Sequence, residues 1–193
     1  LRPLVMSILF LVGSAAAINL PRIVEKSQAE SKGERIVQRW NSPYGWIDAV
    51  QVKGSEIFKI RQNLHYRFGR TGDNRREFRQ AHIPIMLHPD PKEVLFMGLG
   101  TGLTAGGSIP HEGIRQIDVV ELIPEVVEAC RLLAQHNFNV IDHPRVKVFI
   151  DDCRHYLLGT DRRYDVIVSD LFVPWESESG YLYTTEHYQV ARQ

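Results

Sequence analysis

Short apolar runs alternate with helix-like segments along much of this 193-residue chain. Each apolar run has the length of a buried strand, and helix signals follow each of them. Such alternation predicts a parallel sheet of the α/β class. The predicted strands cover 93–98, 115–121, 145–150 and 164–169, and the predicted helices begin near 102, at Pro124, at 152 and near Thr184.

A smaller β region precedes this sheet. Residues 44–52 and 56–60 have the pattern of two strands joined by a turn that contains Gly54, which predicts a hairpin. A helix is predicted next over 75–88, with Pro84 shaping or interrupting it. We therefore expect a small β region over 41–74 and an α/β domain, incomplete at its end, over 75–193.

The start of the chain differs from the rest because residues 4–20 carry no charge. This run is close to the lower limit of ~17–25 residues for a membrane span, which predicts a membrane helix over 3–21. Five basic residues follow it within 22–40, which we expect to be a linker, so the C-terminal side should be cytoplasmic. A signal peptide and a buried helix of a soluble domain are the alternatives.

The first predicted parallel strand runs into a loop with glycine at every second position, Gly98, Gly100 and Gly102. Glycines there let backbone N–H groups approach a ligand closely. A strict dinucleotide fingerprint needs a third glycine where this chain has Leu103, so the loop favours a nucleoside of the S-adenosylmethionine type over NAD. A tight strand-to-helix turn that binds nothing is the alternative.

Each later parallel strand ends in an acidic residue, and these carboxylates are expected to face the same crevice as the glycine loop. Glu121 is placed to accept hydrogen bonds from ribose hydroxyls. Either Asp151 or Asp152 can take the adenine amino group, and the other can cap the helix at 152; capping alone is the alternative. Asp170 opens a loop with no helix start to cap, which favours a functional role.

Overall charge and residue types narrow the function further. The chain has 23 basic and 23 acidic residues, and the basic residues are scattered, so we expect no nucleic-acid partner. Cys130 and Cys153 are expected to be reduced, and the eight histidines form no ligand-spaced cluster, so no metal site is expected. Because the chain runs from Leu1 inside an apolar run to Gln193 inside a predicted helix, we expect it to be a piece of a longer protein.

Five segments together resemble the spermidine/spermine synthase (aminopropyltransferase) family, and more narrowly its bacterial membrane-associated branch. They are AHIPIMLHPDPKEV, VLFMGLGTG, VVELIPEVVEA, FIDDCRHYLL and YDVIVSDLFVPW. The resemblance covers roughly residues 40–193. It implies a small β domain followed by a Rossmann-like, methyltransferase-like domain. It also implies a cytoplasmic catalytic domain anchored in the bacterial inner membrane, and a homodimer.

Members of this family transfer an aminopropyl group from decarboxylated S-adenosylmethionine to a diamine such as putrescine. Mapped onto this chain, the resemblance implies that the three loop glycines pass beneath the nucleoside. It further implies that Glu121 holds the ribose, that Asp152 holds the adenine, and that Asp170 is catalytic by accepting a proton from the amine or orienting it.

The chain departs from the family pattern at four positions. Thr101 stands where the family usually has an acid, Val173 where it has a second aspartate, Arg76 where it has a tyrosine, and Gly45 where it has a glutamine that contacts the cofactor. Several of the replaced groups grip the polyamine in the family, and an arginine beside a dicationic amine would repel it. Two other functions therefore stay open. One is a methyltransferase that uses S-adenosylmethionine itself, and the other is a non-catalytic domain that binds a nucleoside.

Overall fold

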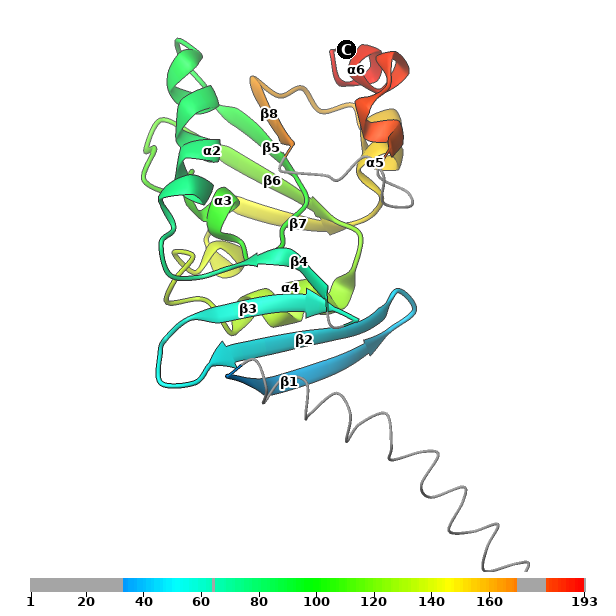
Figure 1. Cartoon of the computed structure of the whole chain (residues 1–193). Helices are drawn as coiled ribbons and strands as arrows, with labels where there is room; N and C mark the ends of the chain where they lie inside the picture. Colours follow the sequence, from blue (N-terminus) through cyan, green and yellow to red (C-terminus); the bar gives the residue numbers. More distant parts are fainter. Residues whose placement is uncertain (1–32, 64, 170–179, 193) are drawn as a thin grey trace, which may run out of the picture.

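The structure is a computed structural model that describes residues 33–63, 65–169 and 180–192. Two four-stranded sheets organise these residues (Figure 1). The first is antiparallel, with strand order β1-β2-β3-β4, and the second is parallel, with order β7-β6-β5-β8. The predicted α/β class, with a small β region before the parallel sheet, is confirmed.

The antiparallel sheet contains more than the predicted hairpin. Its strands are β1 (Glu34–Ser42), β2 (Gly45–Val52), β3 (Phe58–Gln62) and β4 (His65–Arg70). The predicted hairpin corresponds to β2 and β3. The predicted linker over 22–40 is wrong in its last part, because β1 begins at Glu34 and pairs with β2 along its length.

Charged residues in β1 explain why it looks like a linker in the sequence. The Glu34 carboxylate, 4% exposed, accepts hydrogen bonds from Lys59 Nζ at 2.5 Å and from Arg61 at 2.7 Å. Arg39 donates two hydrogen bonds, of 2.6 and 2.8 Å, to the fully buried Asp48. The charges of β1 therefore pair with residues of the neighbouring β2 and, across it, of β3, which lets a polar segment form part of a sheet.

Buried apolar strands form the parallel sheet, as predicted, and helices follow them. The strands are β5 (Glu93–Met97), β6 (Gln116–Glu121), β7 (Val146–Ile150) and β8 (Val166–Ser169). The helices are α2 (Arg75–Leu87), α3 (Leu103–Gly106), α4 (Pro124–Arg131), α5 (Cys153–Gly159) and α6 (Thr185–Ala191), with short 3₁₀ turns η1 (Val140–Asp142) and η2 (Gly180–Tyr183).

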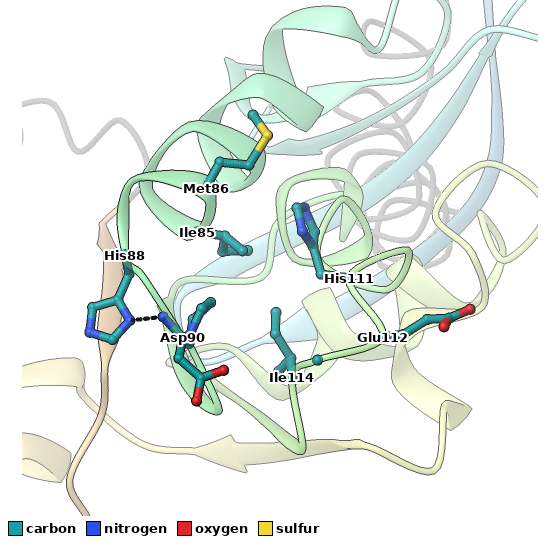
Figure 2. Close-up of a pocket in the computed structure, with 9 residues that line it drawn as sticks. Ile85, Met86, His88, Asp90, His111, Glu112 and Ile114 are labelled. Atoms are coloured by element: carbon teal, nitrogen blue, oxygen red, sulfur yellow. Dashed lines mark hydrogen bonds between the residues drawn. The ribbon is translucent and has the colours of Figure 1, made fainter.

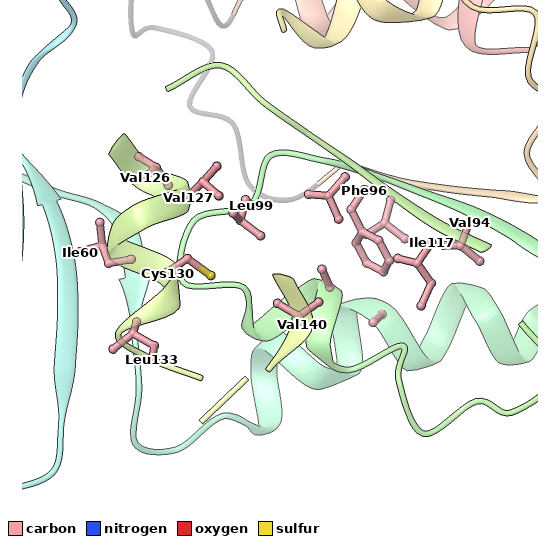
Figure 3. Close-up of a cluster of buried hydrophobic side chains, with 14 of the residues drawn as sticks. Ile60, Val94, Phe96, Leu99, Ile117, Val126, Val127, Cys130, Leu133 and Val140 are labelled. Carbon is pink, nitrogen blue, oxygen red and sulfur yellow. The ribbon is translucent and has the colours of Figure 1, made fainter. Parts of the chain in front are cut away.

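Both faces of the parallel sheet are covered, which is why the inner strand β5 is apolar from Val94 to Met97 without alternation. Val94 and Phe96 of β5 belong to a large core with residues of α2, α3 and α4, part of which Figure 3 shows. Leu95 and Met97 of the same strand belong to a second core on the other face, with residues of α5 and η2. Successive residues of β5 thus point into two different cores.

Helix α4 joins the two sheets, because it packs against strands of both (Figure 1). Ile47 of β2 and Ile60 of β3 are fully buried in the same core as Val126 and Cys130 of α4 (Figure 3). The small sheet is therefore fixed against the α/β unit by apolar packing. This arrangement brings the turn between β1 and β2 close to the start of α4.

A buried carboxylate anchors the segment that leads into β8. Asp118, in the middle of β6, is fully buried and accepts hydrogen bonds from Arg162 at 2.9 Å and from the Tyr164 hydroxyl at 2.7 Å. Burial, together with the hydrogen bonds to Asp118 and Tyr156, raises the pKa of Tyr164. The cluster holds the chain between α5 and β8 onto the sheet, and so positions the strand that precedes residue 170.

Within the residues that the structure describes, no helix has the length and apolar character needed to cross a membrane. The longest of those helices, α2, has 13 residues and contains Pro84. The predicted membrane helix over 3–21 lies outside the described residues, so it stays a prediction.

Candidate active site

The glycine loop connects β5 to α3, as predicted, with positive φ angles of 89° at Gly98, 53° at Gly100 and 73° at Gly102. A Cβ atom on Gly100 would lie 2.7 Å from the Phe68 carbonyl oxygen, and one on Gly102 would lie 2.6 Å from Cys130 Sγ. These two glycines are therefore required by contacts within the protein, to β4 and to α4, whatever ligand the loop meets.

Every backbone N–H of this loop already has an acceptor within the protein. Gly98 donates to the Val120 carbonyl at 2.8 Å, Thr101 to the Phe68 carbonyl at 3.0 Å, and Gly102 to the Leu99 carbonyl at 2.8 Å. The remaining two N–H groups, of Leu99 and Gly100, donate to the carboxylate of Glu121. A phosphate cradle needs free N–H groups that point at the anion. The loop therefore lacks the free N–H donors of a phosphate-binding site, although its glycines leave space for a ligand to approach the backbone.

Glu121 lies at the end of β6 beneath the loop and is 5% exposed. Its Oε2 accepts hydrogen bonds from Leu99 N at 3.0 Å and from Gly100 N at 3.5 Å, and its Oε1 accepts one from Ile123 N at 3.0 Å. Burial raises the pKa of this carboxyl, and the backbone hydrogen bonds act in the opposite direction. Glu121 therefore fixes the loop as well as being the predicted ribose ligand.

Asp152 is the residue of the aspartate pair that caps α5. Its Oδ1 accepts hydrogen bonds from Arg154 N at 2.9 Å and from His155 N at 3.0 Å, and its Oδ2 accepts one from the Tyr181 hydroxyl. The preceding Asp151 instead pairs with His155 Nδ1 at 2.8 Å. The sequence argument about capping would thus leave Asp151 for the adenine, whereas the family resemblance points to Asp152.

A pocket of about 580 Å³ lies at the carboxyl ends of β6 and β7, where sites in parallel sheets are expected. This open pocket is bordered by the starts of α4 and α5 and by the turn between β1 and β2. Its lining residues are Pro43, Tyr44, Leu122, Pro124, Glu125, Ile150, Asp151, Asp152 and His155. Among the described residues, the lining thus combines apolar side chains, three carboxylates and one imidazole, without a lysine or an arginine.

Apart from Asp151 and Asp152, these lining residues are not candidate site residues from the sequence, and they include Tyr44, Glu125 and His155. His155 had a local signal, because it stands four residues after Asp151 at the start of a helix, where i and i+4 side chains meet. Tyr44 had none, because only the packing of the small sheet against α4 brings it to the pocket.

Other predicted features fall elsewhere. Asp170 and Val173 lie outside the described residues, so the role of Asp170 stays a prediction. Thr101 is 4% exposed, and its Oγ1 would lie 3.2 Å from a Cβ atom on Gly69, so its side chain packs against β4. Its carbonyl accepts a hydrogen bond of 2.9 Å from Asn137 Nδ2. Thr101, which departs from the family pattern, thus packs the glycine loop against β4.

Both cysteines are free and buried. Cys153 follows Asp152 directly, and its Sγ lies 3.7 Å from the Val120 carbonyl oxygen. Burial, with Glu121 and Asp152 nearby, raises the pKa of the Cys153 thiol to about 12. Among the described residues there is no group of three or more histidine, cysteine, aspartate or glutamate side chains arranged to hold a metal ion.

A second cavity, of about 330 Å³, lies at the opposite, amino ends of β5 and β6, as Figure 2 shows. Ile85 and Met86 of α2, His88, Asp90, His111 and Glu112 are among its lining residues. Next to it, His82 Nδ1 and His111 Nε2 lie 2.6 Å apart, and burial lowers the pKa of His111. Its position away from the glycine loop and the strand-end acids separates it from the candidate site.

Comparison with known proteins identifies the family. Residues 79–193 match the family model of the spermine/spermidine synthase domain. The chain belongs to this family. Its match includes the glycine loop, Glu121, the two aspartates before α5 and Asp170.

Relatives and solved structures agree with this membership. The polyamine aminopropyltransferase of Serratia proteamaculans is 40% identical over 95 residues, which are 49% of this chain and 33% of that protein. The one from Methanocaldococcus jannaschii is 35% identical over 109 residues, which are 56% of this chain and 37% of that protein. The matched part of the chain thus spans about a third of the length of these two curated relatives.

The fold comparison covers more of the chain. A spermidine synthase in complex with the transition state analogue AdoDATO superposes with a TM-score of 0.68 at 26% identity, covering 82% of this chain and 54% of that one. The spermidine synthase of Thermotoga maritima gives a TM-score of 0.66 at 25% identity, covering 82% and 53%. The small β sheet followed by the parallel sheet is therefore shared with these synthases.

The Asp151–His155 pair generates a prediction about pH. The hydrogen bond to Asp151 raises the pKa of the exposed His155 above its ordinary value of about 6.5. Because the folded-state pKa is raised, the pair stabilises the protein below that ordinary value, and this contribution is lost as the pH rises through the raised pKa. We expect Asp151→Asn to bring the pKa of His155 back down, as measured by NMR titration of the imidazole.

Asp142→Asn is the matched control, because Asp142 pairs with Arg131 on another part of the surface. It should leave the titration of His155 unchanged. Identical titration of His155 in the parent and in Asp151→Asn would show that the pair does not form.

Proposed function

We propose that this chain carries the nucleoside-binding part of an aminopropyltransferase. It would take decarboxylated S-adenosylmethionine and transfer the aminopropyl group to a diamine such as putrescine. Family membership, relatives that are polyamine aminopropyltransferases and a structural neighbour that holds a transition state analogue support this proposal.

The charge of the pocket carries the proposal. Glu125, Asp151 and Asp152 place three carboxylates around apolar walls, and His155 is the one basic side chain among the described residues of the lining. A dinucleotide would bring two phosphates to a site that has acidic side chains and no free loop N–H groups. A sulfonium nucleoside brings positive charge, and an acidic crevice attracts it.

The proposed transfer reaction requires one proton acceptor besides the groups that bind the nucleoside. The amine nitrogen attacks the carbon next to the sulfonium, a C–N bond forms, and the C–S bond electrons leave with sulfur as a neutral thioether. The new ammonium must lose one proton. We assign this proton to Asp170, which follows β8 directly, and assign the ribose to Glu121 and the adenine to Asp151 or Asp152.

Thr101, where the chain departs from the family pattern, supports a methyltransferase as a second candidate function. Its side chain packs against β4, so it cannot replace the acid that the family has there. A methyltransferase that uses S-adenosylmethionine itself has no need of that acid.

An assay of the full chain separates these functions. We expect spermidine and 5′-methylthioadenosine to form in equal amounts from putrescine and decarboxylated S-adenosylmethionine, as measured by mass spectrometry. Asp170→Asn should lower turnover by ~10²-fold or more and leave the affinity for the nucleoside nearly unchanged, because it removes the proton acceptor only. Binding that prefers the carboxylated S-adenosylmethionine, or unchanged turnover in Asp170→Asn, would contradict the assignment.

Glu125 allows a test of the electrostatic argument within one helix. Glu125 lines the pocket, and its Oε2 has no hydrogen-bond partner among the described residues. We expect Glu125→Gln to weaken the cationic decarboxylated S-adenosylmethionine about threefold more than the neutral 5′-methylthioadenosine, in calorimetry at low salt.

Glu128 lies one turn further along α4, with its side chain 58% exposed and paired with Arg131 at 3.8 Å. Glu128→Gln therefore serves as the control and should change the two affinities equally. An equal loss for both ligands in Glu125→Gln would remove Glu125 from the recognition of positive charge.

We also propose that residues 3–21 anchor the domain to a membrane with the catalytic part on the cytoplasmic side. The uncharged run and the basic residues after it support this. Recovery of the chain in salt-washed membranes, lost on deletion of residues 1–21, is the expected result. A chain that stays in the supernatant would contradict it. The homodimer also stays a prediction.

A further inference from the structure

The turn between β1 and β2 brings a tyrosine ring to the lining of the candidate pocket. Pro43 and Tyr44 come from the small antiparallel sheet, whereas the other lining residues come from the ends of β6 and β7 and the starts of α4 and α5. The pocket is therefore assembled by two parts of the chain, with Tyr44 on the side of the small sheet.

Hydrogen bonds hold the backbone of this turn at several points. Tyr44 N donates to Ser42 Oγ at 3.3 Å, and the Tyr44 carbonyl accepts a hydrogen bond from the buried Gln62. Two residues on, Trp46 N donates to Asn63 Oδ1 at 2.9 Å, and Asn63 N donates to the Trp46 carbonyl at 3.0 Å. The backbone position of Tyr44 is thus fixed from both sides.

Gly45 makes this tethering possible. Its φ is 107°, and a Cβ atom on it would lie 2.3 Å from Asn63 Nδ2, so the Asn63 amide occupies the space of the missing side chain. Gly45, one of the four positions that depart from the family pattern, therefore allows Asn63 to hold the turn in place. While its backbone is tied down, Tyr44 remains 41% exposed at the pocket.

We propose that the Tyr44 ring stacks on the purine ring of the nucleoside and determines how firmly the pocket holds it. This inference rests on the proposed function. The other lining side chains include Leu122, Pro124 and Ile150, which provide apolar surface for the same flat ring. An aromatic ring held by a fixed backbone loses little conformational freedom on binding, which favours stacking.

Calorimetry with 5′-methylthioadenosine on the full chain tests this role. Tyr44→Ala should weaken binding about tenfold, the range found for loss of one stacked aromatic ring. Tyr44→Phe keeps the ring and should bind within about twofold of the parent. Tyr188→Ala, which removes a 59% exposed tyrosine of α6 outside the pocket lining, should also bind like the parent.

A second ligand separates stacking from loss of fold. 5-Methylthioribose lacks the purine, so the ratio of its dissociation constant to that of 5′-methylthioadenosine should fall about tenfold in Tyr44→Ala and stay constant in Tyr44→Phe. Equal weakening of both ligands, or equal loss in the Phe and Ala variants, would overturn the stacking role.

Binding of 5′-methylthioadenosine by the parent chain separates failure of the stacking role of Tyr44 from failure of the proposed function. Binding of 5′-methylthioadenosine that is insensitive to Tyr44→Ala would overturn the role of Tyr44 and leave the proposed function standing. A parent chain that binds no adenosyl compound would overturn both.

Discussion

The contacts around the glycine loop are the constraint on which the rest of the site depends. The loop lies between β4, whose Phe68 carbonyl meets Gly100 and Thr101, and α4, whose Cys130 meets Gly102. Glu121 closes it from below by accepting hydrogen bonds from two of its amides. Because the loop touches both the small sheet and the α/β unit, its shape and the relative placement of the two sheets are determined together.

This constraint connects the fold to the chemistry. A loop whose amides are all bonded within the protein presents backbone without spare donors, so in the proposed function side chains match the charge of the nucleoside. The side chains proposed for this are the carboxylates at the ends of β6 and β7, with Glu125 at the start of α4. Buried anchors elsewhere, such as Asp118 beneath Arg162 and Tyr164, keep the neighbouring strands in place.

An element can be predicted from the sequence where one physical cause determines its residues. Strand β5 is predictable because burial on both faces leaves apolar residues from Val94 to Met97, and α4 and α6 begin where Pro124 and Thr184 predict. Strand β1 is not predictable in this way, because its charged residues pair with partners that lie on other strands. Tyr44 and Glu125 likewise reach the pocket only through tertiary packing. The aspartate pair shows the limit most clearly: the sequence allows either residue to cap α5, and three-dimensional geometry selects Asp152.

The buried state of Cys153 has a chemical consequence. A sulfonium nucleoside is an alkylating agent, and the strongest nucleophile a protein can offer it is a thiolate. Cys153 stands one residue after Asp152, and burial raises its pKa to about 12, so the thiol form is favoured at neutral pH. In the proposed reaction, a buried thiol of this kind would not compete with the amine for the electrophile.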